Sequence, residues 1–165
     1  MSSPLPKIIA LALLLLLAAP GYLLAQTEGV GLPRFASIRA DQVNLRTGPG
    51  VRYPIDWVYT RRGAPLEVIA EFDNWRKVRD WKGTVGWVHA SMLTPKRTLI
   101  VLDKVQMLRL TDDDNARPVA RLEPKVVGTI LSCPEGTAFC EVEVGDYKGW
   151  LKRDAFWGVL KDQFF

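Results

Sequence analysis

The chain contains a single histidine, His89, and a serine close to it could act as a nucleophile. Ser91 lies two residues further on, so in an extended strand both side chains would point to the same side. A serine–histidine pair also needs a third group that orients the imidazole ring. No nucleophile-elbow pattern surrounds Ser91. We therefore interpret His89 as an ordinary histidine at the end of a strand and predict that the protein is not an enzyme.

The two cysteines, Cys133 and Cys140, form a second candidate site for chemistry. Six residues separate them, whereas redox pairs and zinc ligands are typically separated by two. In an exported chain, which the N-terminus indicates below, an even number of cysteines predicts a disulfide. Pro134 and Gly136 would allow the flanking strands to approach as a hairpin. A pair of free thiols is the alternative.

Three aspartates and an asparagine, residues 112–115, provide enough oxygen atoms for a calcium ion. The segment lacks the alternating spacing, the glycine and the distal glutamate of a dedicated calcium loop. We interpret it as a solvated turn, and we expect neither a metal site nor a cofactor in this chain.

Aromatic side chains are the strongest candidates for ligand binding, because the chain has six tryptophans. Four aromatic residues lie in or beside the connections around the first predicted strands: Tyr53, Trp57, Tyr59 and Trp81. Some of these must belong to the core, but small barrels can hold extended peptides in grooves lined by aromatic side chains. We predict a ligand-binding surface formed by Arg46, Tyr53, Trp57 and Trp81.

The elements that position these residues are predicted to be strands. Residues 43–46 (Val-Asn-Leu-Arg) alternate apolar and polar side chains, as expected for a strand with one buried face. Residues 47–50 (Thr-Gly-Pro-Gly) then end the strand in a rigid turn. Short β-branched or aromatic runs at 66–70, 75–78 and 84–88 follow, separated by turn residues, and helical periodicity is almost absent. The spacing predicts an all-β fold.

The order of these motifs resembles the bacterial SH3-like domain of secreted and cell-envelope proteins. Its elements are VNLRTGPG at 43–50, WRKV at 75–78 and GTVGWV at 83–88, and the resemblance covers Ile38 to Leu93. It implies a small barrel of five to seven strands in which Trp75 and Trp87 are structural. Domains of this type often accompany cell-wall hydrolases, where they hold peptidoglycan or its peptides.

An internal repeat extends the interpretation to the second half of the chain. The pair Leu45-Arg46 recurs 63 residues later as Leu108-Arg109, and Gly86-Trp87 recurs at the same offset as Gly149-Trp150. In the second copy, Leu-Thr-Asp-Asp at 110–113 replaces Thr-Gly-Pro-Gly, and no tryptophan stands in the place of Trp75. We predict two tandem SH3-like β-barrels, residues 36–95 and 97–160, the second of them degenerate. Whether the second copy closes as an independent barrel stays open.

The first 25 residues have the layout of a cleavable secretory signal. One positive charge, Lys7, precedes an apolar run, Pro20-Gly21 breaks it, and the small residue Ala25 offers a cleavage point. An uncleaved anchor is the alternative, because residues 8–25 are just long enough to span a bilayer. Cleavage would leave 140 residues with 26–35 as a flexible leader, and would place the protein in the periplasm or outside the cell.

The charge balance argues against nucleic acid as a partner. Residues 35–95 contain nine Lys and Arg against six Asp and Glu, and residues 96–165 contain eleven of each. A surplus of three is too small for a nucleic-acid surface. The basic residues of 76–82 are interpreted as solvated outward positions, with a patch that faces an anionic polymer as the alternative.

Together, these features favour a non-catalytic, exported cell-envelope binding module that recognises peptidoglycan or a cell-wall peptide. The alternative is a structural or regulatory module that docks another envelope protein. After cleavage of the signal we expect no stable insertion into the membrane. The identity of the ligand and the oligomeric state stay open.

Overall fold

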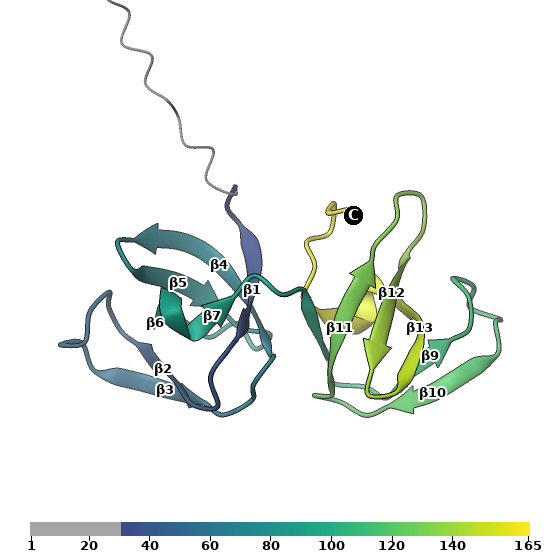
Figure 1. Ribbon diagram of the computed structural model, residues 1–165, viewed down its shortest axis with the longest axis horizontal. Helices are drawn as coiled ribbons and strands as arrows, with labels where there is room; N and C mark the ends of the chain where they lie inside the picture. Colours follow the sequence, from purple (N-terminus) through teal and green to yellow (C-terminus); the bar gives the residue numbers. More distant parts are fainter. Residues whose placement is uncertain (1–30) are drawn as a thin grey trace, which may run out of the picture.

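The computed structural model describes residues 31–165, in which the chain forms strands and two short 3₁₀ turns (Figure 1). The predicted signal at 1–25 and the first five residues of the predicted leader lie outside these residues. None of the described residues belongs to a helix that is long and apolar enough to cross a membrane. The prediction of an all-β fold is confirmed.

The first seven strands form one antiparallel sheet, in the order β3-β2-β6-β5-β4-β1-β7. Their bounds are Arg34–Ile38 (β1), Val43–Arg46 (β2), Ile55–Tyr59 (β3), Pro65–Phe72 (β4), Trp75–Arg79 (β5), Val85–His89 (β6) and Leu93–Thr94 (β7). A single 3₁₀ turn, η1 (Ala90–Met92), lies between β6 and β7. We call this unit, residues 34–94, the first barrel (Figure 1).

The second seven strands repeat this arrangement, in the order β10-β9-β13-β12-β11-β8-β14. Their bounds are Thr98–Val101 (β8), Gln106–Arg109 (β9), Pro118–Leu122 (β10), Val127–Ser132 (β11), Phe139–Val144 (β12), Tyr147–Lys152 (β13) and Phe156–Trp157 (β14). The 3₁₀ turn η2 (Arg153–Ala155) stands where η1 stands in the first copy. We call residues 98–157 the second barrel. The two strand orders correspond one to one, so the 63-residue offset reflects a repeated fold.

Close packing between neighbouring strands explains the repeated sequence motifs. Leu45 and Leu108 are fully buried, each in the core of its own barrel. A Cβ atom on Gly86 would lie 2.6 Å from Cγ of Leu45, and one on Gly149 would lie 2.9 Å from Cγ of Leu108. Both distances are far shorter than a van der Waals contact, so only glycine fits. The repeated Gly-Trp pair therefore lets β6 and β13 pass close to the central leucine.

The two barrels have separate hydrophobic cores. Ten buried residues form the core of the first barrel and twelve that of the second. Burying one Leu or Val side chain stabilises a fold by roughly 1.5–3 kcal/mol. Each barrel thus has its own source of stability, and Val127 of the second barrel also packs against the core of the first.

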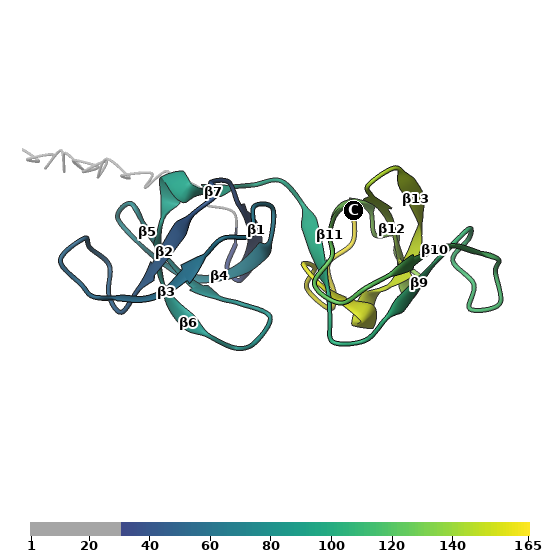
Figure 2. The same cartoon turned by 90° about the horizontal axis from the view of Figure 1, so that it is seen from below.

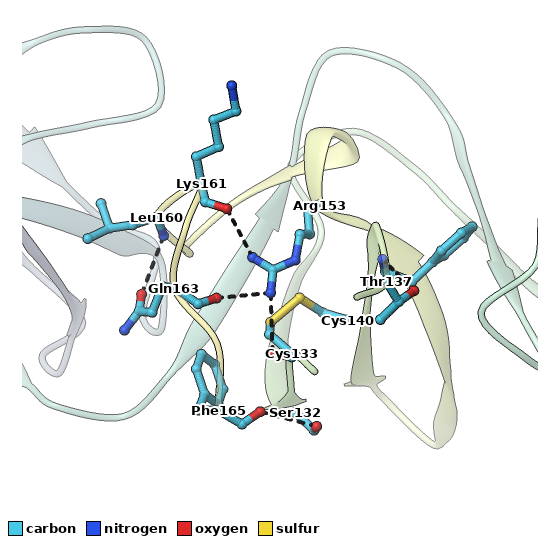
Figure 3. Close-up of a disulfide and its surroundings, with 10 residues drawn as sticks. Ser132, Cys133, Thr137, Cys140, Arg153, Leu160, Lys161, Gln163 and Phe165 are labelled. Atoms are coloured by element: carbon cyan, nitrogen blue, oxygen red, sulfur yellow. Dashed lines mark hydrogen bonds between the residues drawn. A yellow bond between two sulfur atoms is a disulfide. The ribbon is translucent and has the colours of Figure 1, made fainter. Parts of the chain in front are cut away.

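One end of the second barrel is closed by a disulfide and by the C-terminal residues. Cys133 and Cys140 are bonded, which confirms the predicted bridge. The backbone N–H of Cys133 donates to the carbonyl of Phe165 (2.8 Å), and the N–H of Phe165 donates back to the carbonyl of Cys133 (3.1 Å). Figure 3 shows the Arg153 guanidinium beside the bridge, where it donates to the carbonyls of Cys133, Lys161 and Gln163.

The two barrels meet beside the linker of residues 95–97 (Figures 1 and 2). Ser37 Oγ of β1 lies 2.6 Å from the Lys96 carbonyl and 2.6 Å from Thr98 Oγ1 of β8, and Thr98 Oγ1 lies 2.6 Å from the Gly63 carbonyl. Two hydroxyl protons serve these three contacts, so two of them are hydrogen bonds at any one time. Both hydroxyl side chains are buried.

Two further contacts join the barrels. Arg61 Nη1 donates to the carbonyl of Lys125 at 2.7 Å. The rings of Phe35 and Trp157 meet edge to face, with centroids 5.2 Å apart. The interface therefore combines the buried hydroxyl pair with an exposed hydrogen bond and an aromatic pair.

Candidate functional site

A groove of about 420 Å³ on the first barrel is the best candidate for a ligand site. Its walls come from β2 and the residue before it, from the turn after β2, from the start of β5, and from the region where β6 runs into η1. The lining residues are Gln42, Asn44, Arg46, Val51, Trp75, His89, Ser91 and Met92. We call it the first groove. The residues at 42, 44 and 46 line it together because alternate residues of a strand share one face.

The aromatic part of the first groove is a paired tryptophan and histidine. Trp75 of β5 stands directly opposite His89 of β6. Their rings meet edge to face with centroids 5.3 Å apart. Both side chains are partly exposed. The pair therefore offers a ligand an aromatic surface beside a polar ring nitrogen.

Contacts with Ser91 orient the imidazole ring of His89. The backbone N–H of Ser91 donates to Nδ1 of His89 at 3.3 Å, and Ser91 Oγ lies 2.7 Å from the same nitrogen. Because Nδ1 accepts the backbone proton, the ring proton of the neutral imidazole is placed on Nε2. Nε2 makes no hydrogen bond within residues 31–165, so it is available to a ligand as a donor.

This histidine–serine pair lacks the rest of a catalytic arrangement in the part of the chain described. No carboxylate of residues 31–165 forms a hydrogen bond with the imidazole, and Ser91 lies in η1, a single 3₁₀ turn. In hydrolytic triads a carboxylate holds the ring in the productive tautomer. Here the backbone of Ser91 holds it. The absence of enzymatic activity stays a prediction.

Arg46 lines the first groove and also clamps the turn beside it. Its Nη1 donates to the carbonyls of Val51 (3.0 Å) and Tyr53 (2.7 Å). The guanidinium thus fixes the loop of residues 47–54 against β2. Arg46 is one of the four predicted ligand-binding residues, and the structure places it in this groove.

The other three predicted ligand-binding residues lie elsewhere on the first barrel. Tyr53 covers the Gly-Pro-Gly turn, where its ring leaves no space for a side chain on Gly48. Trp57 is 55% exposed on β3, at the edge of the sheet. Trp81 is half-buried against the core and lies 6.4 Å from the ring of Tyr59. Of the four residues, Arg46 alone lines the first groove.

Beneath Trp81, a buried carboxylate organises the turn between β5 and β6. Asp80 is buried, and its Oδ1 accepts from the backbone N–H groups of Lys82 and Thr84, both at 2.9 Å. Its Oδ2 accepts from the hydroxyl of Tyr59 at 3.1 Å. Burial, and then the nearby Asp80 carboxylate, raise the pKa of Tyr59 above its ordinary value. The tyrosine is thereby kept neutral as a hydrogen-bond donor.

Sequence reasoning missed Gln42, Asn44, Trp75 and His89 as one surface. The period-two alternation through residues 42–46 contained the signal for the first two, because it places them on the same face as Arg46. The pairing of Trp75 with His89 depends on the register between β5 and β6, which the sequence does not specify. Neither Gln42 nor Asn44 makes a side-chain hydrogen bond within residues 31–165, so both amides can bind a ligand.

The acidic turn at 112–115 is held by a hydrogen bond within the turn and by an ion pair to β13. Asp113 Oδ1 accepts from the N–H of Asn115 at 2.8 Å, and Asp114 pairs with Lys152. Among residues 31–165, no three His, Cys, Asp or Glu side chains gather in a way that could hold a metal ion.

Comparison with known proteins gives a family for the first barrel. Residues 39–95 match the family model of the bacterial SH3 domain, and the second barrel lies outside this match. No curated protein matches the chain. Among solved structures, NlpC2 from Trichomonas vaginalis is similar, with 11% identity, a TM-score of 0.36, and coverage of 81% of this chain and 51% of that protein.

NlpC1 from the same organism is similar as well, also with 11% identity and a TM-score of 0.35. The match covers 77% of this chain and 46% of NlpC1. The chain therefore spans about half the length of each of these two proteins.

Proposed function

We propose that this chain, whose residues 39–95 are a bacterial SH3 domain, is a non-catalytic, exported binding module that recognises peptidoglycan or a cell-wall peptide through the first groove. Bacterial SH3 domains are typically cell-envelope modules, which supports the assignment of this chain to the class of exported binding modules. The groove supports the ligand class, because it combines an aromatic surface with free amide groups.

The observation that carries the proposal is a set of solvent-accessible polar groups around Trp75 that make no hydrogen bond within residues 31–165. The amides of Gln42 and Asn44 and the Nε2–H of His89 have no partner among residues 31–165 and border the same groove. Together they provide donors and acceptors that can pair with a peptide backbone, while Trp75 offers an aromatic face to the bound chain. A short, polar, extended peptide fits this chemistry.

Sedimentation with purified peptidoglycan tests the proposal. Trp75→Ala, and separately Gln42→Ala with Asn44→Ala, are expected to reduce the bound fraction at least tenfold, as for residues that anchor a ligand. Trp57→Ala is the matched control, because it removes an exposed tryptophan outside the groove and should leave binding unchanged. Thermal unfolding shows whether each variant is folded. Normal binding by both groove variants would contradict the proposal.

Docking of another envelope protein is the second candidate function, and the edge strand β3 favours it. β3 pairs with β2 alone, so its outer backbone groups are free to pair with an added strand. Ile55 and Trp57 on this strand are 49% and 55% exposed. In this case Trp57→Ala, and not Trp75→Ala, would abolish crosslinking to an envelope partner.

Export is tested by the mass of the mature protein. A cleaved signal predicts an N-terminus at or near Gln26 in the periplasmic or secreted fraction. Recovery of the chain with Met1 intact would contradict cleavage and would favour a module that stays anchored in the membrane.

A further inference from the structure

The second barrel contains a cavity at the position equivalent to the first groove. Trp75 faces His89 across β5 and β6, and at the same place in β12 and β13, Phe139 faces Lys152. A hollow of about 250 Å³ lies against this second pair. We call it the second groove. The repeat has therefore preserved the hollow as well as the strands.

The arginine that borders each groove is also preserved. Arg109 lines the second groove, and its Nη1 donates at 2.8 Å to the carbonyl of Ala116, seven residues further on. Arg46 donates in the same way to the carbonyl of Tyr53, which is also seven residues further on. In both barrels the arginine thus folds the following loop against the groove.

The chemistry of the second groove differs from that of the first. Val105 and Met107 stand 63 residues after Gln42 and Asn44, so two apolar side chains replace the two amides. Val105 is 40% exposed and Met107 is 43% exposed. Apolar side chains that share one exposed hollow are typical of a surface that contacts a ligand.

An ion pair crosses the mouth of the second groove. Lys152 takes the place of His89, and Asp114 takes the place of Val51. Lys152 Nζ lies 2.6 Å from Asp114 Oδ2 and 5.7 Å from the centroid of the Phe139 ring. The two side chains are 41% and 59% exposed. Because exposed ion pairs contribute little to stability, another carboxylate can displace Asp114 at little cost.

We propose that the second groove is a second ligand site, which binds a peptide through a free carboxylate. The carboxylate takes the place of Asp114 on Lys152, and the apolar part of the peptide contacts the exposed side chains of Val105 and Met107. The inference rests on the proposed function, because it takes the first groove to be a ligand site. It adds a different specificity: the first groove offers neutral donors and acceptors, and the second offers a cation beside apolar surface.

NMR titration of the full mature protein tests this proposal with three small probes. They are N-acetyl-alanyl-alanine, its C-terminal amide, and an N-acetyl-glutamyl-alanine amide that carries its carboxylate on the side chain. We expect the two carboxylate probes to shift the signals of Phe139 and Lys152, and the neutral amide to bind there at least tenfold more weakly. The tighter of the two carboxylate probes identifies a terminal or a side-chain carboxylate as the source.

Variants of the ion pair give the decisive result. Asp114→Asn frees Lys152 and should tighten binding of the carboxylate probes about twofold to fivefold, the effect of removing an exposed ion pair. Lys152→Met should weaken binding at least tenfold. Lys148→Met and Glu141→Gln are matched controls, since these residues form another ion pair on the second barrel, in which Lys148 is 59% exposed and stands on the same strand as Lys152, and they should change nothing.

Three results would each overturn the proposal. The first is equal binding of the acid and amide probes, and the second is no binding of the carboxylate probes to either the wild type or Asp114→Asn. The third is an unchanged affinity in Lys152→Met. Shifts at Trp75 and His89 report on the first groove in the same spectra. Failure of the proposed function is therefore visible separately from failure at the second groove.

Discussion

At the scale of the residue, the buried pair of Tyr59 and Asp80 makes the stability of the first barrel depend on pH. The hydroxyl of Tyr59 must stay protonated to donate to Asp80, and burial together with that carboxylate raises the pKa of Tyr59. A group whose pKa is raised on folding contributes stability that is complete below its unfolded pKa and is lost as the pH rises above it. The loss should therefore begin near pH 10, the ordinary pKa of tyrosine.

Tyr59→Phe tests this link. At neutral pH the variant loses one buried hydrogen bond and should be less stable by about 1–3 kcal/mol. Above pH 10 the wild type should lose up to about 1.4 kcal/mol per pH unit from this residue, and the variant should not. Urea unfolding at pH 7 and pH 11 measures both effects. Tyr147→Phe removes an exposed tyrosine and is the control; parallel pH profiles for all three proteins would contradict the argument.

At the scale of the element, the disulfide hairpin and the C-terminal residues form one unit. The guanidinium carbon of Arg97 lies 3.9 Å from the centroid of the Phe165 ring. Phe165 also exchanges two backbone hydrogen bonds with Cys133. Figure 3 shows Arg153 between the bridge and the backbone of residues 161–163. The first barrel has instead an ion-pair cluster at its corresponding end, in which Arg34 and Arg76 both contact Glu71.

Deletion of residues 164–165 should therefore loosen the hairpin without affecting the first barrel. The backbone groups of Cys133 lose their partners, which costs about 1–3 kcal/mol for a buried group left unsatisfied. Hydrogen exchange at the Cys133 amide should accelerate, whereas exchange at the fully buried Val78 of the first barrel should not change. Reduction of the disulfide is a separate perturbation, worth about 2–3 kcal/mol for a loop this short. Unchanged exchange at Cys133 after the deletion would show that residues 164–165 do not stabilise the hairpin.

The sequence predicted the strands and turns of the barrels well where a single local rule determined them. The alternation in residues 43–46, the rigid turn after them and the Gly-Trp pairs each follow from backbone or packing requirements, and all reappear in the structure. The sequence shows that no tryptophan stands in the place of Trp75, but the position of Phe139 opposite Lys152 depends on the register between β12 and β13. The first groove depends on the register of paired strands. Such long-range pairing is set by the whole sheet, so no single stretch reveals it.

At the scale of the whole molecule, the barrels are joined by more than their linker. Thr98 contacts both Gly63 and Ser37 of the first barrel, and the Phe35–Trp157 pair lies at the same interface. A buried hydroxyl that is shared in this way favours one arrangement of the two bodies, since any other leaves polar groups unpaired. Each barrel also has its own core, so the interface can weaken without unfolding either of them.

Thr98→Val should separate these two properties. Valine has the shape of threonine, so β8 should keep its place, but the hydroxyl contacts to Ser37 and Gly63 are lost. We expect both barrels to remain folded and to move relative to each other, so that residual dipolar couplings require one alignment tensor in the wild type and two in the variant. Thr111→Val, in the exposed loop after β9, is the control and should keep a single tensor. If Thr98→Val also keeps one tensor, the hydroxyl contacts do not fix the arrangement, and adding Phe35→Ala, which removes the aromatic pair, should then release the barrels.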